Sequence, residues 1–244
     1  MQLLAWLIVP VLLLVAVPHE LAHLFAARRF GVKVLEFGLG LPPRACSFEW
    51  RGTRWSINWL LPFGAFVKLK GEDQGSEADD FAALCPWQRA IVILAGPVAN
   101  LVVAGVAIGL SLWLIDRPAG LQAVVVRDEP FVLGWVGVAQ LMEELSNVGI
   151  SAWSWFLALV ASLSLGLGVA NLLPVPPLDG ARVGLALMEL RVGRPVLSHR
   201  WAVRLNLMGL ALLIVVFAVV TGADLVRLLS GGVLVAHGEH PLLH

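Results

Sequence analysis

The chain has 244 residues, of which 59% are hydrophobic and 14% are charged, and its mean hydropathy is +0.85. This composition excludes an ordinary water-soluble domain and indicates a protein with several membrane-spanning segments. The 17 basic and 17 acidic residues give a formal net charge of zero, so no overall attraction to nucleic acid is expected. Two cysteines, Cys46 and Cys85, are too few for a disulfide framework.

Four apolar segments are each close to the ~20 residues that a helix needs to cross a bilayer. We predict membrane-spanning helices at about 3–25, 90–115, 152–173 and 205–226. The first segment has neither a positively charged start nor a small-residue cleavage site, so we interpret it as a retained helix rather than a signal peptide. The prediction is an all-α polytopic membrane protein with a single domain over residues 1–244.

The connection between the first two helices carries a strand pattern at 44–70. Residues 48–59 are typical of a hairpin around Gly52, and residues 64–69 of a further short strand. Indole rings settle at the membrane interface, so three tryptophans favour a small membrane-associated sheet: Trp50, Trp55 and Trp59. The alternative is a water-facing hairpin that only links the two helices.

The basic residues predict the orientation of the helices. Nine lie between the first and second helices and five between the third and fourth, whereas the outer loop 116–150 and the C-terminal tail together hold three. Positive residues concentrate on the cytoplasmic side, so both termini are predicted to lie outside. Within the short outer loop we predict a strand at 123–126 and an amphipathic helix at 138–148 lying on the membrane.

The segment His19-Glu20-Leu21-Ala22-His23 is an H-E-x-x-H pattern near the end of the first apolar helix. Histidines four residues apart share one helix face and can bind one metal ion, and Glu20 lies where the general base for a metal-activated water belongs. Ionisable side chains at membrane depth are energetically costly, which makes these three residues functional candidates.

A catalytic zinc usually has three protein ligands, so two histidines leave one ligand to be found. The third helix is predicted to run parallel to the first and leads into N-L-L-P-V-P-P-L-D-G at 171–180. The prolines of this segment break the helix, and Asp179 then falls at the depth of the two histidines. We predict that His19, His23 and Asp179 can converge on one metal ion, with water entering from the cytoplasmic side. An alternative role for Asp179 is the N-cap of a helix that starts at Gly180.

These patterns occur together with P-F-G-A-F-V-K-L at 62–69 and A-G-P-V-A-N at 95–100. In this order they resemble the site-2 protease family of intramembrane zinc metalloproteases, over most of the chain. The resemblance is closest to bacterial members that cleave membrane-anchored anti-sigma factors. It implies a Zn2+ ion held by His19, His23 and Asp179, with Glu20 as the catalytic base.

The resemblance also implies how a substrate is bound and where the protein resides. Asn171 would contact the substrate backbone, and the strand at Gly64, Ala65, Phe66 and Val67 would hold the substrate in extended form by strand addition. The alternative for Asn171 is to satisfy a backbone group freed by the prolines. The expected protein is a multi-pass component of the bacterial inner membrane, in contact with lipid. It would cleave a membrane-embedded peptide or single-span protein near the cytoplasmic face. No pattern in the sequence indicates an oligomeric state.

One feature departs from the family pattern. The anti-sigma-cleaving members carry one or two PDZ domains in the outer loop, whereas the loop 116–150 has about 35 residues, too few for one. Substrate selection is therefore expected to differ. The competing function is a membrane metal transporter or a zinc-stabilised scaffold, although the outer-facing residues show no convergent metal-binding pattern. A narrower alternative keeps the protease and changes its substrate to a pro-protein or a signal-peptide remnant.

Overall fold

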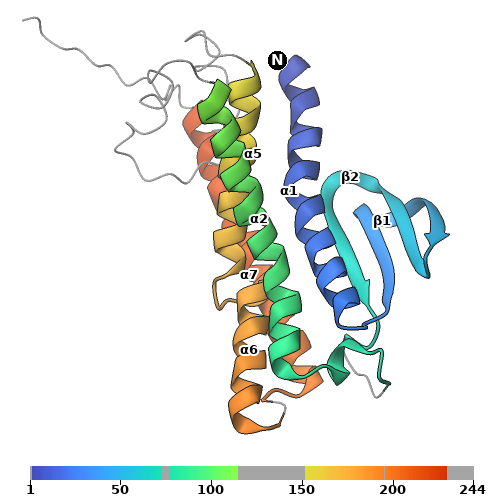
Figure 1. Cartoon of the computed structure of the whole chain (residues 1–244). Helices are drawn as coiled ribbons and strands as arrows, with labels where there is room; N and C mark the ends of the chain where they lie inside the picture. The colour runs from blue at the N-terminus through green and yellow to red at the C-terminus, as the bar shows by residue number, and fades with distance from the viewer. Residues whose placement is uncertain (1, 73–76, 115–151, 195, 230–244) are drawn as a thin grey trace, which may run out of the picture.

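The structure is a computed structural model that describes residues 2–72, 77–114, 152–194 and 196–229. In chain order the elements are α1 (Gln2–Arg29), β1 (Val34–Trp50), β2 (Thr53–Leu69), η1 (Phe81–Ala83), α2 (Pro86–Leu114), α5 (Ala152–Asn171), α6 (Asp179–Val192) and α7 (His199–Leu229). The long helices run roughly along one direction, and the sheet lies beside α1 (Figure 1). The strand predicted at 123–126 and the helix predicted at 138–148 lie outside the described residues.

Three helices are long and apolar enough to cross a membrane: Val9–Arg29 within α1, Pro86–Trp113 within α2 and Arg200–Ala223 within α7. The apolar stretch of α5, Phe156–Asn171, is shorter than the ~20 residues that a spanning helix needs. The described chain is thus mostly helical with three candidate spans. The third predicted span, 152–173, coincides with α5, but the apolar part of this helix does not reach spanning length.

Helix α2 is central to the packing, because it contacts α1, α5 and α6. Its approach to α5 is close at Gly168, where an added Cβ would lie 3.2 Å from the Pro97 carbonyl oxygen. Without a hydrophobic driving force in lipid, small residues allow such helices to approach and gain van der Waals contact. A buried cluster that includes Leu24, Val92 and Val183 joins α1, α2 and α6 to the sheet.

The sheet begins ten residues earlier than predicted, at Val34 rather than at residue 44. The side chains of Val34 and Phe37 are buried in the core shared with α1 and α2, and this burial stabilises the strand before the predicted hairpin begins. The hairpin itself has Trp50 opposite Thr53. Its two turn residues, Arg51 and Gly52, have φ values of 50° and 72°, the left-handed pair that a two-residue hairpin turn requires.

The two strands are long and bent, so one part of β1 pairs with both ends of β2. Glu36 lies opposite Arg54 on one side and opposite Lys68 on the other. The final segment of β2, residues 65–69, pairs with β1 along one side only among the described residues. This segment is therefore an edge with free backbone groups, and β2 packs against α1.

Helix α6 was not among the predicted spans, and a helix starting at Gly180 was considered only as an alternative role for the segment. It begins directly after the proline segment and ends at Gly193, whose left-handed backbone (φ 72°) lets its N–H donate to the Glu189 carbonyl. An ion pair between Arg89 and Glu189 links α6 to α2. The chain after Asp179 is consequently held against the central helix instead of forming an open loop.

Candidate metal centre

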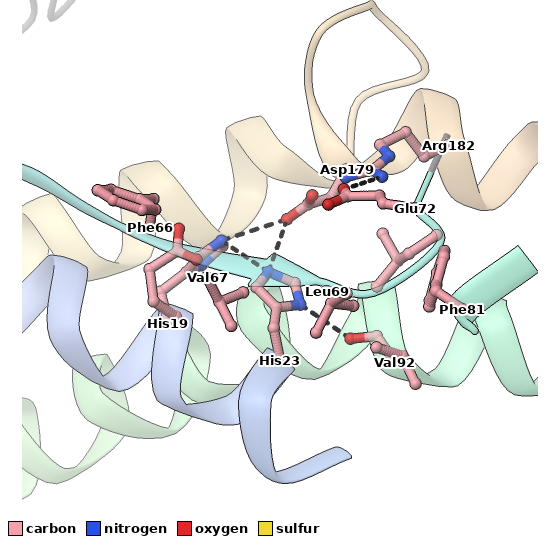
Figure 2. Close-up of a pocket in the computed structure, with 12 residues that line it drawn as sticks. His19, His23, Phe66, Val67, Leu69, Glu72, Phe81, Val92, Asp179 and Arg182 are labelled. Carbon is pink, nitrogen blue, oxygen red and sulfur yellow. Dashed lines mark hydrogen bonds and ion pairs between the residues drawn. The ribbon is translucent and has the colours of Figure 1, made fainter. Parts of the chain in front are cut away.

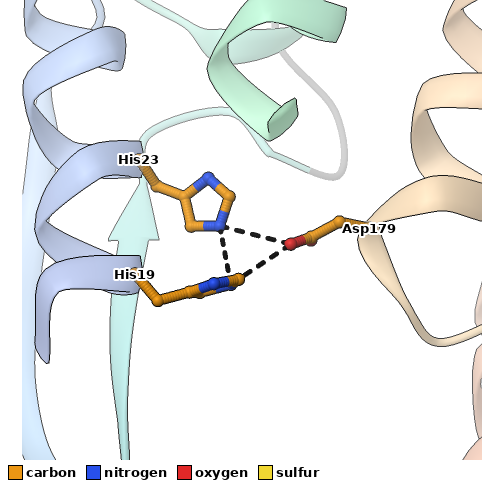
Figure 3. Close-up of side chains that lie close together, drawn as sticks. All are labelled: His19, His23 and Asp179. Atoms are coloured by element: carbon orange, nitrogen blue, oxygen red, sulfur yellow. Dashed lines mark hydrogen bonds and ion pairs between the residues drawn. The ribbon is translucent and has the colours of Figure 1, made fainter. Parts of the chain in front are cut away.

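Two adjacent turns of α1 and the first residue of α6 bring three possible metal ligands together (Figure 3). The Asp179 Oδ2 atom lies 3.2 Å from His19 Nε2 and 3.4 Å from His23 Nε2, and the two Nε2 atoms are 3.2 Å apart. The histidines are buried, with exposed fractions of 6% and 9%. These three side chains form the one group with metal-ligand spacing among the described residues.

The hydrogen bonds around the group leave electron pairs facing a common point. The His23 Nδ1–H donates to the Val92 carbonyl oxygen of α2 at 2.8 Å, which leaves Nε2 as the ligand atom. Among the described residues, Asp179 Oδ2 is buried with no hydrogen-bond partner beyond its approach to the two histidines, and His19 Nδ1 is buried without a partner. Two imidazoles and a carboxylate are a donor set that zinc takes in catalytic sites, and a cation between them would compensate the buried Asp179 Oδ2 atom. The residues present therefore fit a zinc ion.

The surroundings of Asp179 argue against its alternative role as a helix cap. The N-cap position of α6 is occupied by Leu178, and no side-chain capping bond is formed there. Burial opposes ionisation of the Asp179 carboxyl, but the adjacent His19 and His23 outweigh it and hold the pKa well below its usual range. The carboxylate is thus charged and directed at the histidines.

Gly96 of α2 is a site residue to which the sequence reasoning assigned no role. A Cβ built at this position would lie 2.6 Å from His23 Cε1 and 2.8 Å from His19 Cε1, and still closer to His23 Nε2. The absent side chain is what lets both imidazole rings lie against α2. The signal available in the sequence was a glycine inside a helical pattern, in the A-G-P-V-A-N segment, which often marks close packing.

The histidine pair opens onto a cavity of about 210 Å³ between α1, the edge of β2, α2 and α6 (Figure 2). Glu20 lines it, and its carboxylate is within hydrogen-bonding range of the Val67 backbone. On the side of α6, Arg182 and Glu72 form an ion pair across the cavity wall. The candidate base therefore lies between the metal ligands and the strand edge.

The predicted substrate-binding residues separate into two groups. Phe66 and Val67 line the cavity, whereas Gly64 and Ala65 precede them on the same strand and are not part of its lining. Asn171 is buried at the last residue of α5, and it does not line the cavity either. One end of the predicted strand segment therefore lies at the cavity, whereas Asn171 is outside its lining.

Residues 6–216 match peptidase family M50, the site-2 protease family. The chain belongs to peptidase family M50. This M50 chain is 38% identical over 116 residues to a Thermotoga maritima protein, a match that covers 44% of the chain and 23% of that relative. A Campylobacter jejuni protein is 34% identical over 110 residues, covering 43% of the chain and 28% of the relative. A Clostridium acetobutylicum protein is 31% identical over 137 residues, covering 55% and 35%.

Each of these three relatives is named a "putative zinc metalloprotease". The chain matches at most 35% of the length of each of these three relatives. Each match therefore covers only part of the relative, not its whole architecture.

Proposed function

We propose that this M50 chain is an intramembrane zinc endopeptidase. The observation that carries the proposal is the convergence of His19, His23 and Asp179 from two separate helices beside Glu20, within a cavity bordered by a strand edge. The apolar lengths of α1, α2 and α7 support placement in a membrane. No observation favours the transporter or scaffold alternative, and membership of a peptidase family weighs against it.

In the proposed reaction, His19, His23 and Asp179 hold the zinc ion. Bound zinc supplies a Lewis acid that polarises the scissile carbonyl and lowers the pKa of a water molecule. Glu20 removes a proton from that water and delivers it to the leaving amine. The Val67 backbone beside its carboxylate keeps Glu20 directed into the cavity. The hydrogen bond from His23 to Val92 fixes which ring nitrogen faces the metal.

The edge of β2 suggests how the substrate is presented. A peptide added as a further strand along residues 65–69 would be extended, with its carbonyl groups exposed to attack, whereas a helical peptide shields them within its own hydrogen bonds. Phe66 and Val67 would contact its side chains, and Asn171 its backbone. The proposed substrate is a single-span membrane protein, such as an anti-sigma factor, cut in or near its transmembrane segment.

The proposed topology follows from the same arrangement. We take α5 as a fourth membrane span, because it packs against the central spanning helix α2. Both termini would lie outside and the metal site near the cytoplasmic face of the bacterial inner membrane, in agreement with the predominance of basic residues in the first and third connections.

The test compares membrane proteomes of cells that express wild type or Glu20→Gln. We expect a shortened single-span protein only with wild type, while purified Glu20→Gln retains zinc in the same stoichiometry because no ligand is changed. Cleavage by Glu20→Gln at the wild-type rate would refute the mechanism. Zinc flux into liposomes, with no membrane peptide cleaved by the wild type, would favour the transporter instead.

A further inference from the structure

The ligand Asp179 is delivered by a short non-helical segment, residues 172–178, between α5 and α6. Inside this segment the Val175 N–H donates to the Leu173 carbonyl at 2.8 Å and the Leu178 N–H donates to the Val175 carbonyl at 2.9 Å. These are local bonds. They shape the segment, but they do not fix its position relative to α1, where the two histidines lie.

Contacts between backbones fix that position from two sides. On the side of α5, Gly180 packs so closely that an added Cβ would lie 2.5 Å from the Leu172 carbonyl carbon. On the side of α7, an added Cβ at Gly209 would lie 2.9 Å from the Pro177 nitrogen and still closer to the Pro176 carbonyl oxygen. Pro176 is three residues before Asp179.

The contact at Gly209 is the main attachment of α7 near the site. Gly209 is the one buried residue among the α7 positions whose exposure the structure describes. Its neighbours Met208 and Leu210 are 67% and 47% exposed. Between α6 and the start of α7 there is instead a cavity of about 610 Å³, whose wall includes Pro176, Leu185 and Leu205. Gly209 is therefore a buried point at which α7 touches the backbone of the segment that carries Asp179.

We propose that Gly209 is a positioning residue for the metal site: α7 holds Asp179 at the distance of the two histidines by direct backbone contact with Pro176. This inference rests on the proposed function, since it assumes that Asp179 is a zinc ligand. A methyl group at Gly209 cannot be accommodated without a shift at this contact, and we expect Pro176 and the segment that leads to Asp179 to move. Zinc–ligand distances tolerate deviations of only about 0.2 Å, so a small displacement of Asp179 weakens binding.

The experiment measures metal binding by purified full-length protein, not cleavage. Gly209→Ala is compared with Gly222→Ala, a matched control in the same helix whose added Cβ meets nothing within 4 Å. We expect Zn2+ affinity, measured by chelator competition, to fall at least about tenfold in Gly209→Ala, the scale of changes around metal ligands. The visible spectrum of the Co2+-substituted protein should change with it, and Gly222→Ala should match wild type in both.

Wild-type affinity and an unchanged Co2+ spectrum in Gly209→Ala would overturn the inference while leaving the proposed function intact. Failure of wild type itself to bind Zn2+ or Co2+ would overturn both. If Gly209→Ala does not fold, a second measurement uses spin labels at Val175→Cys and Met208→Cys, with Cys46 and Cys85 replaced by serine. Strong dipolar broadening between the labels is expected from the contact. Its absence would show that α7 does not hold the segment.

Discussion

The close approach of Gly96 to both histidines makes Gly96→Ala the most demanding test of the metal site. An added Cβ would lie 2.6 Å from His23 Cε1 and 2.8 Å from His19 Cε1, whereas uncrowded carbon atoms lie about 3.5 Å or more apart. The His23 ring must therefore retreat by about 1 Å. Its Nδ1 is tied to Val92 of the same helix, so the ring cannot retreat without straining or breaking that hydrogen bond.

A displacement of about 1 Å is several times the ~0.2 Å that a zinc–nitrogen bond tolerates. We expect the Zn2+ affinity of Gly96→Ala to fall by about 100-fold, the upper end of effects from residues that orient metal ligands, equivalent to about 2.7 kcal/mol. The helix should not be weakened, because alanine is a better helix former than glycine by about 0.5–1 kcal/mol.

The assay is zinc content after purification, followed by competition with a chelator of known affinity. Gly105→Ala is the matched control, since it lies in the same helix and its added Cβ meets nothing within 4 Å. It should retain wild-type zinc binding. Equal zinc affinity in Gly96→Ala and Gly105→Ala would show that the rings do not lie against α2, and the ligand geometry derived from it would be wrong.

Three further changes test the ligands, the strand edge and the sheet. Asp179→Asn removes the charge of the third ligand and should lower zinc retention more than about tenfold; unchanged metal content after purification would remove it from the ligand set. Ala65→Pro should reduce cleavage and Ala65→Ser should not. Backbone N–H groups alternate in direction along a strand, so the Ala65 N–H points away from β1, as does the Val67 N–H beside Glu20. Equal cleavage by both would argue against strand addition. Burial opposes ionisation of Glu36, but its polar neighbours, with Arg44 at 2.9 Å, outweigh it and lower its pKa below 4.5. A carboxylate whose pKa is lowered on folding stabilises the fold at pH values above its unfolded-state pKa. This stabilisation is lost as the pH falls through the folded-state pKa. Glu36→Gln should thus unfold at lower temperature than wild type at pH 7, and a difference that persists undiminished in acid would contradict this.

The convergence of His19, His23 and Asp179 was predictable because it depends on long-range order that the sequence displays directly. The spacing of His19 and His23 defines a helix face, and the basic residues imply that the first and third predicted helices run in parallel. That argument brings Asp179 to the depth of the histidines without any knowledge of packing. The hairpin turn at Gly52 was predictable for a similar reason, since a two-residue turn needs a residue that accepts positive φ.

The remaining features depend on contacts between distant segments, which no local pattern displays. The early start of β1 follows from the burial of Val34 against α1 and α2, whereas locally the segment after α1 resembles a loop. Helix α6 follows a proline-rich stretch that, taken alone, indicates irregular backbone. In the sequence, Gly96 and Gly209 cannot be told apart from other glycines in apolar helices, because their role depends on the atoms that face them in the fold.

Glycines also explain how Asp179, which follows a non-helical segment, can be placed accurately beside the histidines. Apolar side chains gain little by leaving lipid for one another, so association depends on close van der Waals contact between backbones. Gly180 and Gly209 provide such backbone contacts, and Gly96 leaves room for the two imidazole rings against α2. The ion pair of Arg182 with Glu72 also reaches the cavity wall, but these side chains are 37% and 30% exposed, and exposed pairs contribute little. Steric contact therefore contributes more than this surface ion pair to the position of Asp179, which is why even the smallest substitutions, from glycine to alanine, are expected to weaken zinc binding.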